Sequence, residues 1–342
     1  MGLQMGGATS RDGTVLSVRQ LGPATTIALA SDAAVAQTVP TTDRSAKKVV
    51  GLFLNRSLRT RLGLASACAD AGAAYIDLQP DRIYSPLLLE PGIPFEEESI
   101  ADIVRVVDMH AHCFAIRAFG PRPSLPVGRG DTLVQQIAQM SCIPILNLES
   151  DSAHPIQGVA DLATLMTLGP VRGRRVVIAW AYSPAARPIA PTYSFLMASA
   201  AAGAAVTIVA PREFALPKGI TDAARNWAAE SGGQIKETTD LAQAVKHAEV
   251  LYMKSWLAPA SDGSDHVSVA DNYRSWCATE SLMALAGASQ PRYMHCLPAD
   301  RGNEVTDAVI DGPRSLVWRQ VAMRQAVTQA MVDRALAQTP PG

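Results

Sequence analysis

The sequence predicts an α/β protein with two domains, each a mostly parallel sheet covered by helices. Strand-like runs rich in Val, Ile and Leu alternate with Ala-rich helical segments, an order that favours parallel sheets. The chain has 342 residues, more than one hydrophobic core usually supports. A helical segment at residues 156–168 lies between two series of strands and can connect the two halves.

The first series starts with an amphipathic helix. Residues 22–38 are fairly apolar, but Asp32 interrupts them and no basic segment precedes a long apolar core, so we expect neither a signal peptide nor a membrane span. Residues 48–54 predict a buried strand, and residues 60–73 an Ala-rich helix. Further along, we expect strands at residues 74–78, 113–119 and 143–148 and helices at residues 100–110 and 132–140.

The second series follows a basic turn at residues 172–175. Apolar runs predict strands at residues 176–180, 206–210, 250–254 and 293–297, and a terminal helix at residues 322–337. We therefore divide the chain into a first domain at residues 1–160, a second domain at residues 161–318 and a C-terminal helix at residues 319–342.

Composition excludes several classes of function. The net charge is −1 and charged residues make up 18% of the chain, so no charge excess indicates a nucleic-acid or membrane surface. The five cysteines are scattered, without CxxC pairs or metal-like spacing. Reduced thiols in a cytoplasmic protein fit this pattern, and no metal site is expected.

A polar turn at residues 53–63 joins the first predicted strand to its helix. The free N–H groups at such a helix start attract an anion. Ser57, Arg59 and Thr60 can add hydroxyl and charge-assisted hydrogen bonds around a phosphate. The turn therefore predicts a phosphate site, although a helix cap followed by surface arginines would use the same residues.

Other polar residues follow strands elsewhere in the chain. In open α/β sheets, ligands bind outside the carboxyl ends of the strands, so these residues are expected to converge on one cleft between two sheets. The residues are Arg117, Glu149, His154, Gln157, Lys254 and the run His295-Cys296-Leu297-Pro298.

Four short motifs carry a resemblance to a known family. They are Ser-Leu-Arg-Thr-Arg at residues 57–61, Arg-Ala-Phe at 117–119, His-Pro-Ile-Gln at 154–157 and His-Cys-Leu-Pro at 295–298. In this order and at these separations they resemble the aspartate/ornithine carbamoyltransferase family. Lys-Ser-Trp at residues 254–256, the turn at residues 180–184 and Glu149 shortly before His154 resemble its N-acetylornithine and N-succinylornithine branch.

The resemblance implies transfer of the carbamoyl group from carbamoyl phosphate to the neutral amine of a small, amino-acid-like acceptor. It implies a homotrimer that needs no metal or organic cofactor, and a terminal helix that packs back on the first domain. That domain would bind carbamoyl phosphate, and the second would select the acceptor.

The resemblance also assigns roles to residues. Arg59, Arg117 and His154 would be catalytic, because they bind the dianion and polarise the carbonyl as negative charge develops on it. The carbamoyl phosphate-binding residues would be Ser57, Leu58, Arg59, Thr60, Arg117, His154, Gln157, Leu297 and Arg324, with the Gln157 side chain and the Leu297 carbonyl orienting the carbamoyl NH2 group. The acceptor-binding residues would be Glu149, Lys254, Cys296 and Arg301.

Structural explanations exist beside these roles. Arg117 at a strand end can be a surface ion pair, His154 before a helix can merely cap it, and Cys296 is typical of a buried, inert thiol. Lys254 follows a buried run, where acceptor binding and a paired structural lysine are both plausible. The alternative functions are carbamoylation of a different amine in a specialised pathway and a non-catalytic paralogue that binds phosphorylated metabolites.

The stretch after His-Cys-Leu-Pro departs from the branch. Asp300 and Glu304 stand near positions where acylornithine enzymes carry basic residues, and Arg301 matches the second basic residue. Like charges close together repel, so we expect N-acetylornithine to be a poor acceptor. Tyr84 and Ser85 lie near the position where this branch has a Trp from a neighbouring subunit, and the sequence leaves open whether a neighbour contributes either residue.

Overall fold

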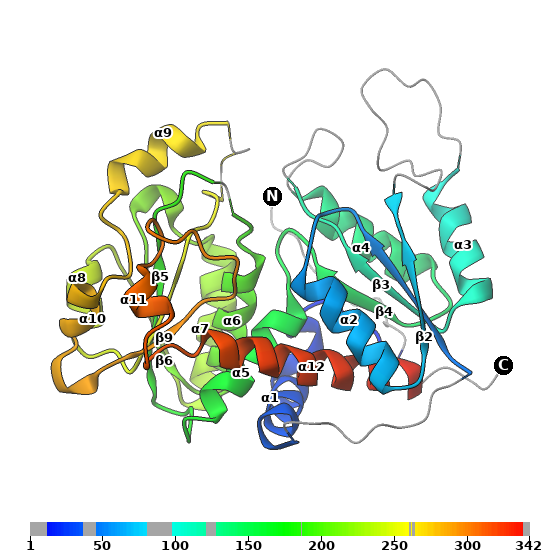
Figure 1. Ribbon diagram of the computed structural model, residues 1–342, viewed down its shortest axis with the longest axis horizontal. Coiled ribbons are helices and arrows are strands. Elements are labelled where there is room, and N and C mark those ends of the chain that lie inside the picture. The colour runs from blue at the N-terminus through cyan, green and yellow to red at the C-terminus, as the bar shows by residue number, and fades with distance from the viewer. Residues whose placement is uncertain are drawn as a thin grey trace.

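Two parallel sheets lie side by side in the computed structural model, which describes residues 12–36, 46–80, 98–120, 128–185, 187–259, 261 and 264–337 (Figure 1). The first sheet has the order β2-β1-β3-β4 and the second the order β7-β6-β5-β8-β9. All strand pairs in both sheets are parallel. The strands are β1 (Lys48–Phe53), β2 (Ala74–Leu78), β3 (Cys113–Arg117), β4 (Ile145–Glu149), β5 (Arg175–Trp180), β6 (Ala205–Val209), β7 (Gln234–Thr238), β8 (Val250–Lys254) and β9 (Arg292–Met294).

Helices cover both faces of each sheet. The helices are α1 (Val18–Ala36), α2 (Arg59–Asp70), α3 (Ile100–His110), α4 (Arg129–Met140), α5 (Pro155–Met166), α6 (Ala190–Ala201), α7 (Lys218–Ser231), α8 (Leu241–Val245), α9 (His266–Ala270), α10 (Glu280–Ala284), α11 (Asp307–Ile310) and α12 (Val317–Ala337). Among the described residues, 3-10 turns lie at Arg212–Phe214, Asp271–Tyr273 and Gly287–Ser289.

Side chains of the strands alternate between separate cores, as a period of two requires. Val49 and Phe53 of β1 face the largest core, whereas Val50 and Leu52 face a second core beneath α3 and α4. In the second sheet, alternate residues of β5 pack into the largest core or into a third core beneath α8, α10 and α11. Because both faces are covered, the inner strands β3, β5 and β8 read as nearly continuous apolar runs in the sequence.

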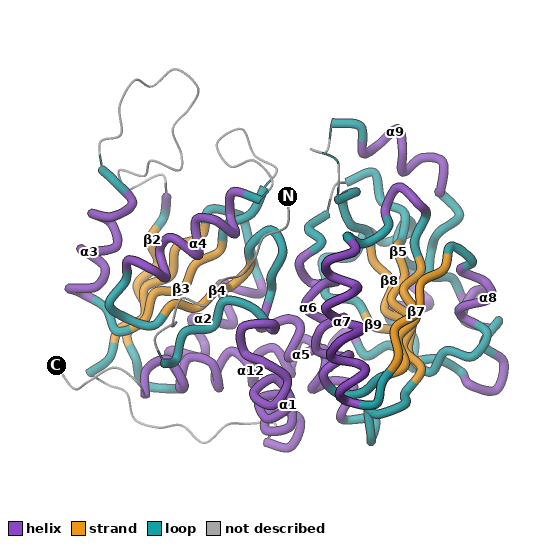
Figure 2. Tube along the Cα trace, turned by 180° about the vertical axis from the view of Figure 1, so that it is seen from behind, coloured by secondary structure: helices purple, strands orange, loops and turns teal. Residues whose placement is uncertain are grey.

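Three helices join the two sheets into one body. Helices α1, α5 and α12 contribute to the same large core as α2, α6 and α7, and from behind they lie between the two sheets (Figure 2). The terminal helix α12 packs on α2, where Gln325 donates a hydrogen bond to Asp70. The expected two-sheet α/β architecture is confirmed, and α12 does return to the first sheet.

Helix α5 also packs closely on α6 of the second half. A Cβ atom on Gly158 would lie 2.7 Å from backbone atoms of Ser194, so this contact requires glycine. Close by, the Ser194 hydroxyl accepts a hydrogen bond of 2.9 Å from the backbone N–H of His154. The position of the α5 N-terminus is therefore set by the second half of the chain.

The main differences from the predicted elements lie in the second half. The sequence patterns missed β7, whose burial alternates irregularly at the sheet edge, and did not identify helices α6 to α11. The strand expected at residues 293–297 ends at Met294, because the His295 N–H turns to Gln320 and Leu297 adopts a left-handed backbone conformation. Within the described residues, no helix is long and apolar enough to cross a membrane.

Candidate active site

The turn between β1 and α2 forms one side of the candidate site. The Ser57 hydroxyl accepts a hydrogen bond of 3.2 Å from the backbone N–H of Thr60, so it caps the first turn of α2. Leu58 is exposed, and its side chain packs against no core; only its backbone can contribute to binding. The turn thus presents backbone N–H groups and the Thr60 hydroxyl at the positive end of a helix.

Three guanidinium groups gather at this helix start, and we call Arg59, Arg117 and Arg324 the arginine cluster. Arg324 of α12 donates to the Thr60 hydroxyl at 2.9 Å, and Arg117 at the end of β3 donates to the same oxygen at 3.4 Å. Burial, followed by repulsion from Arg59 and Arg117, lowers the pKa of Arg324 to about 10. Burial also lowers the pKa of Arg59, which the nearby charge of Arg117 lowers further. Such a concentration of positive charge favours an anionic ligand.

Glu149 balances part of this charge. Its carboxylate forms an ion pair with Arg117, and both side chains are almost completely buried. The backbone supports the pair, because Ala118, next to Arg117, donates its N–H to the Glu149 carbonyl at 2.8 Å. Three guanidinium groups therefore face one carboxylate, which leaves an excess of positive charge at the site.

His154 stands at the N-terminus of α5 beside Glu149. The distance from His154 Nε2 to Glu149 Oε2 is 3.6 Å, too long for a hydrogen bond, and its Nδ1 has no partner among the described residues. The side chain does not cap the helix. The imidazole is thus buried beside the arginine cluster with hydrogen-bonding capacity unused.

We expect His154 to stay neutral at pH values where a free histidine is half protonated. Burial lowers the pKa of His154 well below 6.5, and the charges of Arg324, Arg117 and Arg59 lower it further. As the pH falls below 6.5, the unfolded chain takes up this proton before the folded protein does, so the free energy of unfolding decreases. An NMR titration of ¹⁵N-labelled histidine measures this directly. Protonation of His154 near pH 6.5 would contradict the argument.

The loop after β9 supplies the far wall of the site. His295 is fixed on both ring nitrogens: Nδ1 accepts the Leu297 N–H at 2.9 Å, and Nε2 lies 3.4 Å from Glu304. Leu297 has a φ of 56°, in the left-handed region, and the Leu297–Pro298 peptide is cis. His295 therefore fixes the backbone of Leu297 and, with it, the position of the Leu297 carbonyl.

Lys254 reaches the site from the end of β8. It is 4% exposed, and its ammonium group donates to the Pro188 carbonyl at 3.0 Å and to the Ser255 carbonyl. Burial lowers the pKa of Lys254, although the carboxylates of Glu304 and Glu149 oppose that shift. Burial likewise raises the pKa of Cys296, which makes it a protonated thiol in the wall. Lys254 thus stabilises the backbone through its hydrogen bonds and also places a buried cation near Glu149.

One expected acceptor-binding residue, Arg301, is not brought together with this cluster. Arg301 donates instead to Asp307 and Asp311, two exposed carboxylates on the outer side of the loop. Tyr84 and Ser85 lie outside the described residues. Of the other expected residues, Thr60, Arg117, Glu149, His154 and Arg324 lie against one another.

Sequence reasoning missed Arg187, which precedes α6. Its Nε is buried without a partner among the described residues, and its charge lowers the pKa of Lys254. Arg187 therefore lies beside Lys254 on the second-sheet side of the site. The only sequence signal was an Arg-Pro pair a few residues after a predicted strand.

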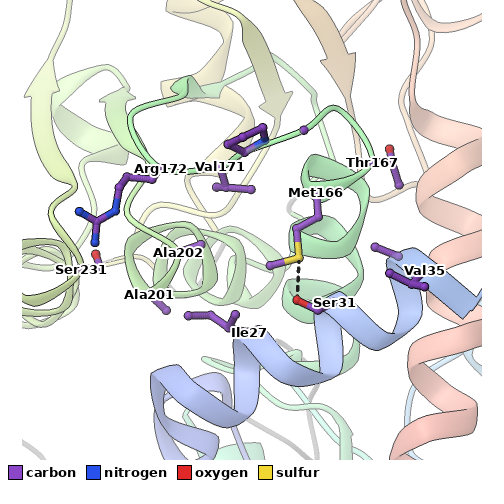
Figure 3. A pocket seen from close by; sticks show the side chains of 13 residues that line it. Ile27, Ser31, Val35, Met166, Thr167, Val171, Arg172, Ala201, Ala202 and Ser231 are labelled. Atoms are coloured by element: carbon purple, nitrogen blue, oxygen red, sulfur yellow. Dashed lines mark hydrogen bonds between the residues drawn. The ribbon is translucent and has the colours of Figure 1, made fainter.

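A cavity of about 580 Å³ is lined by none of these residues (Figure 3). It is lined by α1 residues such as Ile27 and by Met166, Val171 and Ala202, which precede the amino ends of β5 and β6. The polar residues described above follow the carboxyl ends of strands, so this cavity is at the opposite edge of the second sheet. Within the described ranges, no group of three His, Cys, Asp or Glu side chains could hold a metal ion.

Comparison with family models assigns the chain to a class. Residues 14–167 match the carbamoyl-P binding domain of aspartate/ornithine carbamoyltransferases, and residues 191–334 match their Asp/Orn binding domain. With these two domain matches on its two parallel sheets, the chain is a carbamoyltransferase. It belongs to the aspartate/ornithine carbamoyltransferase family.

Individual relatives agree with this assignment. The chain is 29% identical to the N-acetylornithine carbamoyltransferase of Xylella fastidiosa (strain 9a5c) over 301 residues, covering 85% of this chain and 89% of the relative. It is 33% identical to the ornithine carbamoyltransferase of Rhodococcus opacus (strain B4), covering 84% and 83%. A crystal structure of an N-acetyl-L-ornithine transcarbamylase with carbamyl phosphate and N-succinyl-L-norvaline superposes with a TM-score of 0.85 at 27% identity, covering 94% of this chain and 99% of that one. The resemblance to the acylornithine branch is thereby confirmed.

Proposed function

We propose that this enzyme transfers the carbamoyl group from carbamoyl phosphate to the side-chain amine of an acylated diamino acid, with residues 1–160 binding the donor and residues 161–318 selecting the acceptor. The arginine cluster around Thr60 carries the proposal, because three guanidinium groups at a helix start suit a phosphate dianion. The acylornithine acceptor is supported by the relatives, several of which are N-acetylornithine carbamoyltransferases.

In this proposal, the phosphate of the donor binds the N–H groups of the turn, the hydroxyls of Ser57 and Thr60, and the arginine cluster. Arg117 is placed to contact both the phosphate and the carbonyl oxygen, since it lies between Thr60 and Glu149. Because these cations are held in place before the ligand arrives, little reorganisation is needed as the phosphate takes up charge on leaving.

His154 acts on the carbonyl oxygen. A neutral imidazole N–H donates a hydrogen bond that strengthens as the attacked carbonyl becomes an oxyanion. Carbamoylation also needs the acceptor as a neutral amine held close to the carbamoyl carbon. Glu149 at the site can accept a hydrogen bond from that amine and keep it in place. Binding and orientation of the two substrates therefore account for most of the rate enhancement.

The structure changes the argument about acceptor charge. Glu304 does not face the acceptor: its carboxylate is 0% exposed and accepts hydrogen bonds from the backbone N–H groups of Ser255 and Asp300, both at 2.6 Å. Burial opposes ionisation, but attraction to His295, a hydrogen bond from it and the charge of Lys254 lower the pKa of Glu304 to about 2. Of the two expected acidic groups, only Asp300 remains, and it accepts a hydrogen bond of 2.7 Å from Ser183.

The acceptor carboxylate is therefore expected to bind near Lys254 and Arg187, with Arg301 held elsewhere by its own carboxylates. The deciding experiment is phosphate release from carbamoyl phosphate with a panel of amines: N-acetylornithine, N-succinylornithine, ornithine, putrescine and diaminopropionate. Preference for an acylated diamino acid supports the proposal. Preference for an unacylated amine favours the alternative of a different, specialised acceptor, and binding of carbamoyl phosphate without turnover favours a non-catalytic paralogue.

Replacing Lys254 with methionine should raise KM for the acceptor by about tenfold or more, because a buried charged hydrogen bond to the acceptor is lost. KM for carbamoyl phosphate should change little, since Lys254 does not contact the arginine cluster. The measurement is steady-state kinetics with the best amine of the panel. Lys246→Met serves as the matched control. It removes an exposed lysine at the end of α8 whose ammonium group donates a hydrogen bond to Gln243. Equal effects of the two substitutions on acceptor KM would assign Lys254 a structural role alone.

A further inference from the structure

Asp161 is a completely buried carboxylate on α5, one helical turn after Gln157. Its Oδ1 atom accepts two hydrogen bonds of 2.7 Å, one from Gln157 Nε2 and one from Gln320 Nε2 of α12. Burial raises the pKa of Asp161 to about 7, against the effect of these two hydrogen bonds. Burying a carboxylate costs free energy, and an apolar residue would pack between the helices equally well. Helix packing therefore does not explain an aspartate at this position.

The two hydrogen bonds fix the orientation of both amide groups. Gln320 Oε1 accepts the backbone N–H of His295 at 2.9 Å, so the NH2 group of Gln320 has to face Asp161. Gln157 likewise turns its NH2 group to the carboxylate, because an oxygen in that place would be repelled. The oxygen of Gln157 is then left buried with no partner among the described residues.

We infer that Asp161 is a positioning residue for the carbamoyl NH2 group. It turns the Gln157 oxygen toward the substrate as one acceptor, and through Gln320 it holds the His295–Leu297 backbone that carries the second acceptor, the Leu297 carbonyl. This inference rests on the proposed function. Two acceptors match the two N–H bonds of a carbamoyl group, and their placement leaves the carbonyl oxygen for Arg117 and His154.

The same arrangement selects the carbamoyl group over an acyl group of equal size. Acetyl phosphate has a methyl group in place of NH2 and would leave the buried Gln157 oxygen without a donor. A site built around a hydrogen bond rejects an analogue that lacks it, because its own polar group remains unpaired. The ratio of acetyl phosphate to carbamoyl phosphate affinity therefore measures the positioning effect of Asp161. Replacing a residue with a purely structural role would not change this ratio.

The test compares Asp161→Leu with Asp161→Asn in the full-length protein by calorimetric titration with carbamoyl phosphate, acetyl phosphate and inorganic phosphate. For Asp161→Leu we expect the Kd of carbamoyl phosphate to rise about tenfold, with the other two values within about twofold of wild type. Asp161→Asn should recover most of the lost affinity. Gln320 is fixed by His295, so the oxygen of an asparagine would still face both amides.

Thr164→Val is the matched control on the same helix. It also removes a buried polar atom, but one that bonds only the Ala160 carbonyl of its own helix, so all three Kd values should stay within about twofold. If Asp161→Leu does not fold, Gln320→Leu replaces it, with the same selective loss of carbamoyl phosphate affinity expected.

Equal weakening of all three ligands by Asp161→Leu would overturn the inference, as would an Asp161→Asn protein as impaired as Asp161→Leu. Either result would leave the proposed function intact. A folded wild-type protein that binds none of the three phosphates would contradict the proposed function itself. The binding readout needs no acceptor amine, so it does not depend on identifying that substrate.

Discussion

Arg59→Ala should lower kcat/KM for carbamoyl phosphate by about 30-fold to 1,000-fold, equivalent to a loss of roughly 2 to 4 kcal/mol in transition-state binding. The fold should persist, because Arg59 is only half-buried and its Nε bonds no other described group. Arg59 is a cleaner test than Arg117, whose removal would leave Glu149 buried without its partner. Steady-state kinetics together with a thermal melting curve measure both effects.

Arg61→Ala is the control for this substitution. Arg61 lies two residues further along α2, but its guanidinium pairs with Asp77 and stacks over the Phe53 ring, away from the arginine cluster. We expect its kcat/KM within about threefold of wild type, since a partly exposed ion pair contributes about 1 kcal/mol or less. Near-normal catalytic efficiency in a folded Arg59→Ala protein would remove the phosphate site from the account.

His154→Ala should reduce kcat by about 100-fold while carbamoyl phosphate affinity falls much less. The hydrogen bond from the imidazole strengthens only as the oxyanion forms, so its loss affects the transition state more than the bound substrate. The measurement separates kcat from the Kd of carbamoyl phosphate, which can be titrated in the absence of an amine.

His154→Asn separates this role from helix capping. Asparagine is a preferred residue at a helix N-terminus but lacks the reach and the N–H geometry of imidazole. The His154 side chain makes no capping hydrogen bond in the structure, so the Asn variant should be as slow as the Ala variant. Recovery of kcat in the Asn variant would show that His154 acts as a helix cap.

The strands around the site could be predicted because both faces of each sheet are buried. Continuous apolar runs predicted β8 and the starts of β1 and β3 well, and the polar residues that follow them marked the edge where ligands bind. The exposed edge strand β7 gave no such signal, since only one of its five residues is buried.

Contacts between distant segments were beyond local patterns. Arg324 lies 264 residues from Thr60 in sequence, and only the resemblance brought α12 to the phosphate turn. Arg301 and Glu304 lie in one loop, yet one is held outward by two carboxylates and the other is sealed inside beside His295. In irregular backbone, side-chain direction has no period from which it can be predicted.

The spacing of Asp161 from Gln157 is a weak sequence signal of its role. Gln157 and Asp161 stand four residues apart, the spacing at which side chains meet on a helix, in a segment whose other residues are nearly all apolar. A polar pair at this spacing in a buried helix indicates a hydrogen-bonded unit. The partner on α12 could not be read from the sequence.

Carbamoyl transfer at the arginine cluster is tested most directly by following ¹³C-labelled carbamoyl phosphate by NMR with wild-type protein, Arg59→Ala and Arg61→Ala. Wild-type protein and Arg61→Ala are expected to move the label onto the acceptor amine with release of an equal amount of phosphate. Arg59→Ala should form this product at least about 30 times more slowly. Transfer of the label by Arg59→Ala at the wild-type rate, or no labelled product with any amine of the panel, would contradict the account.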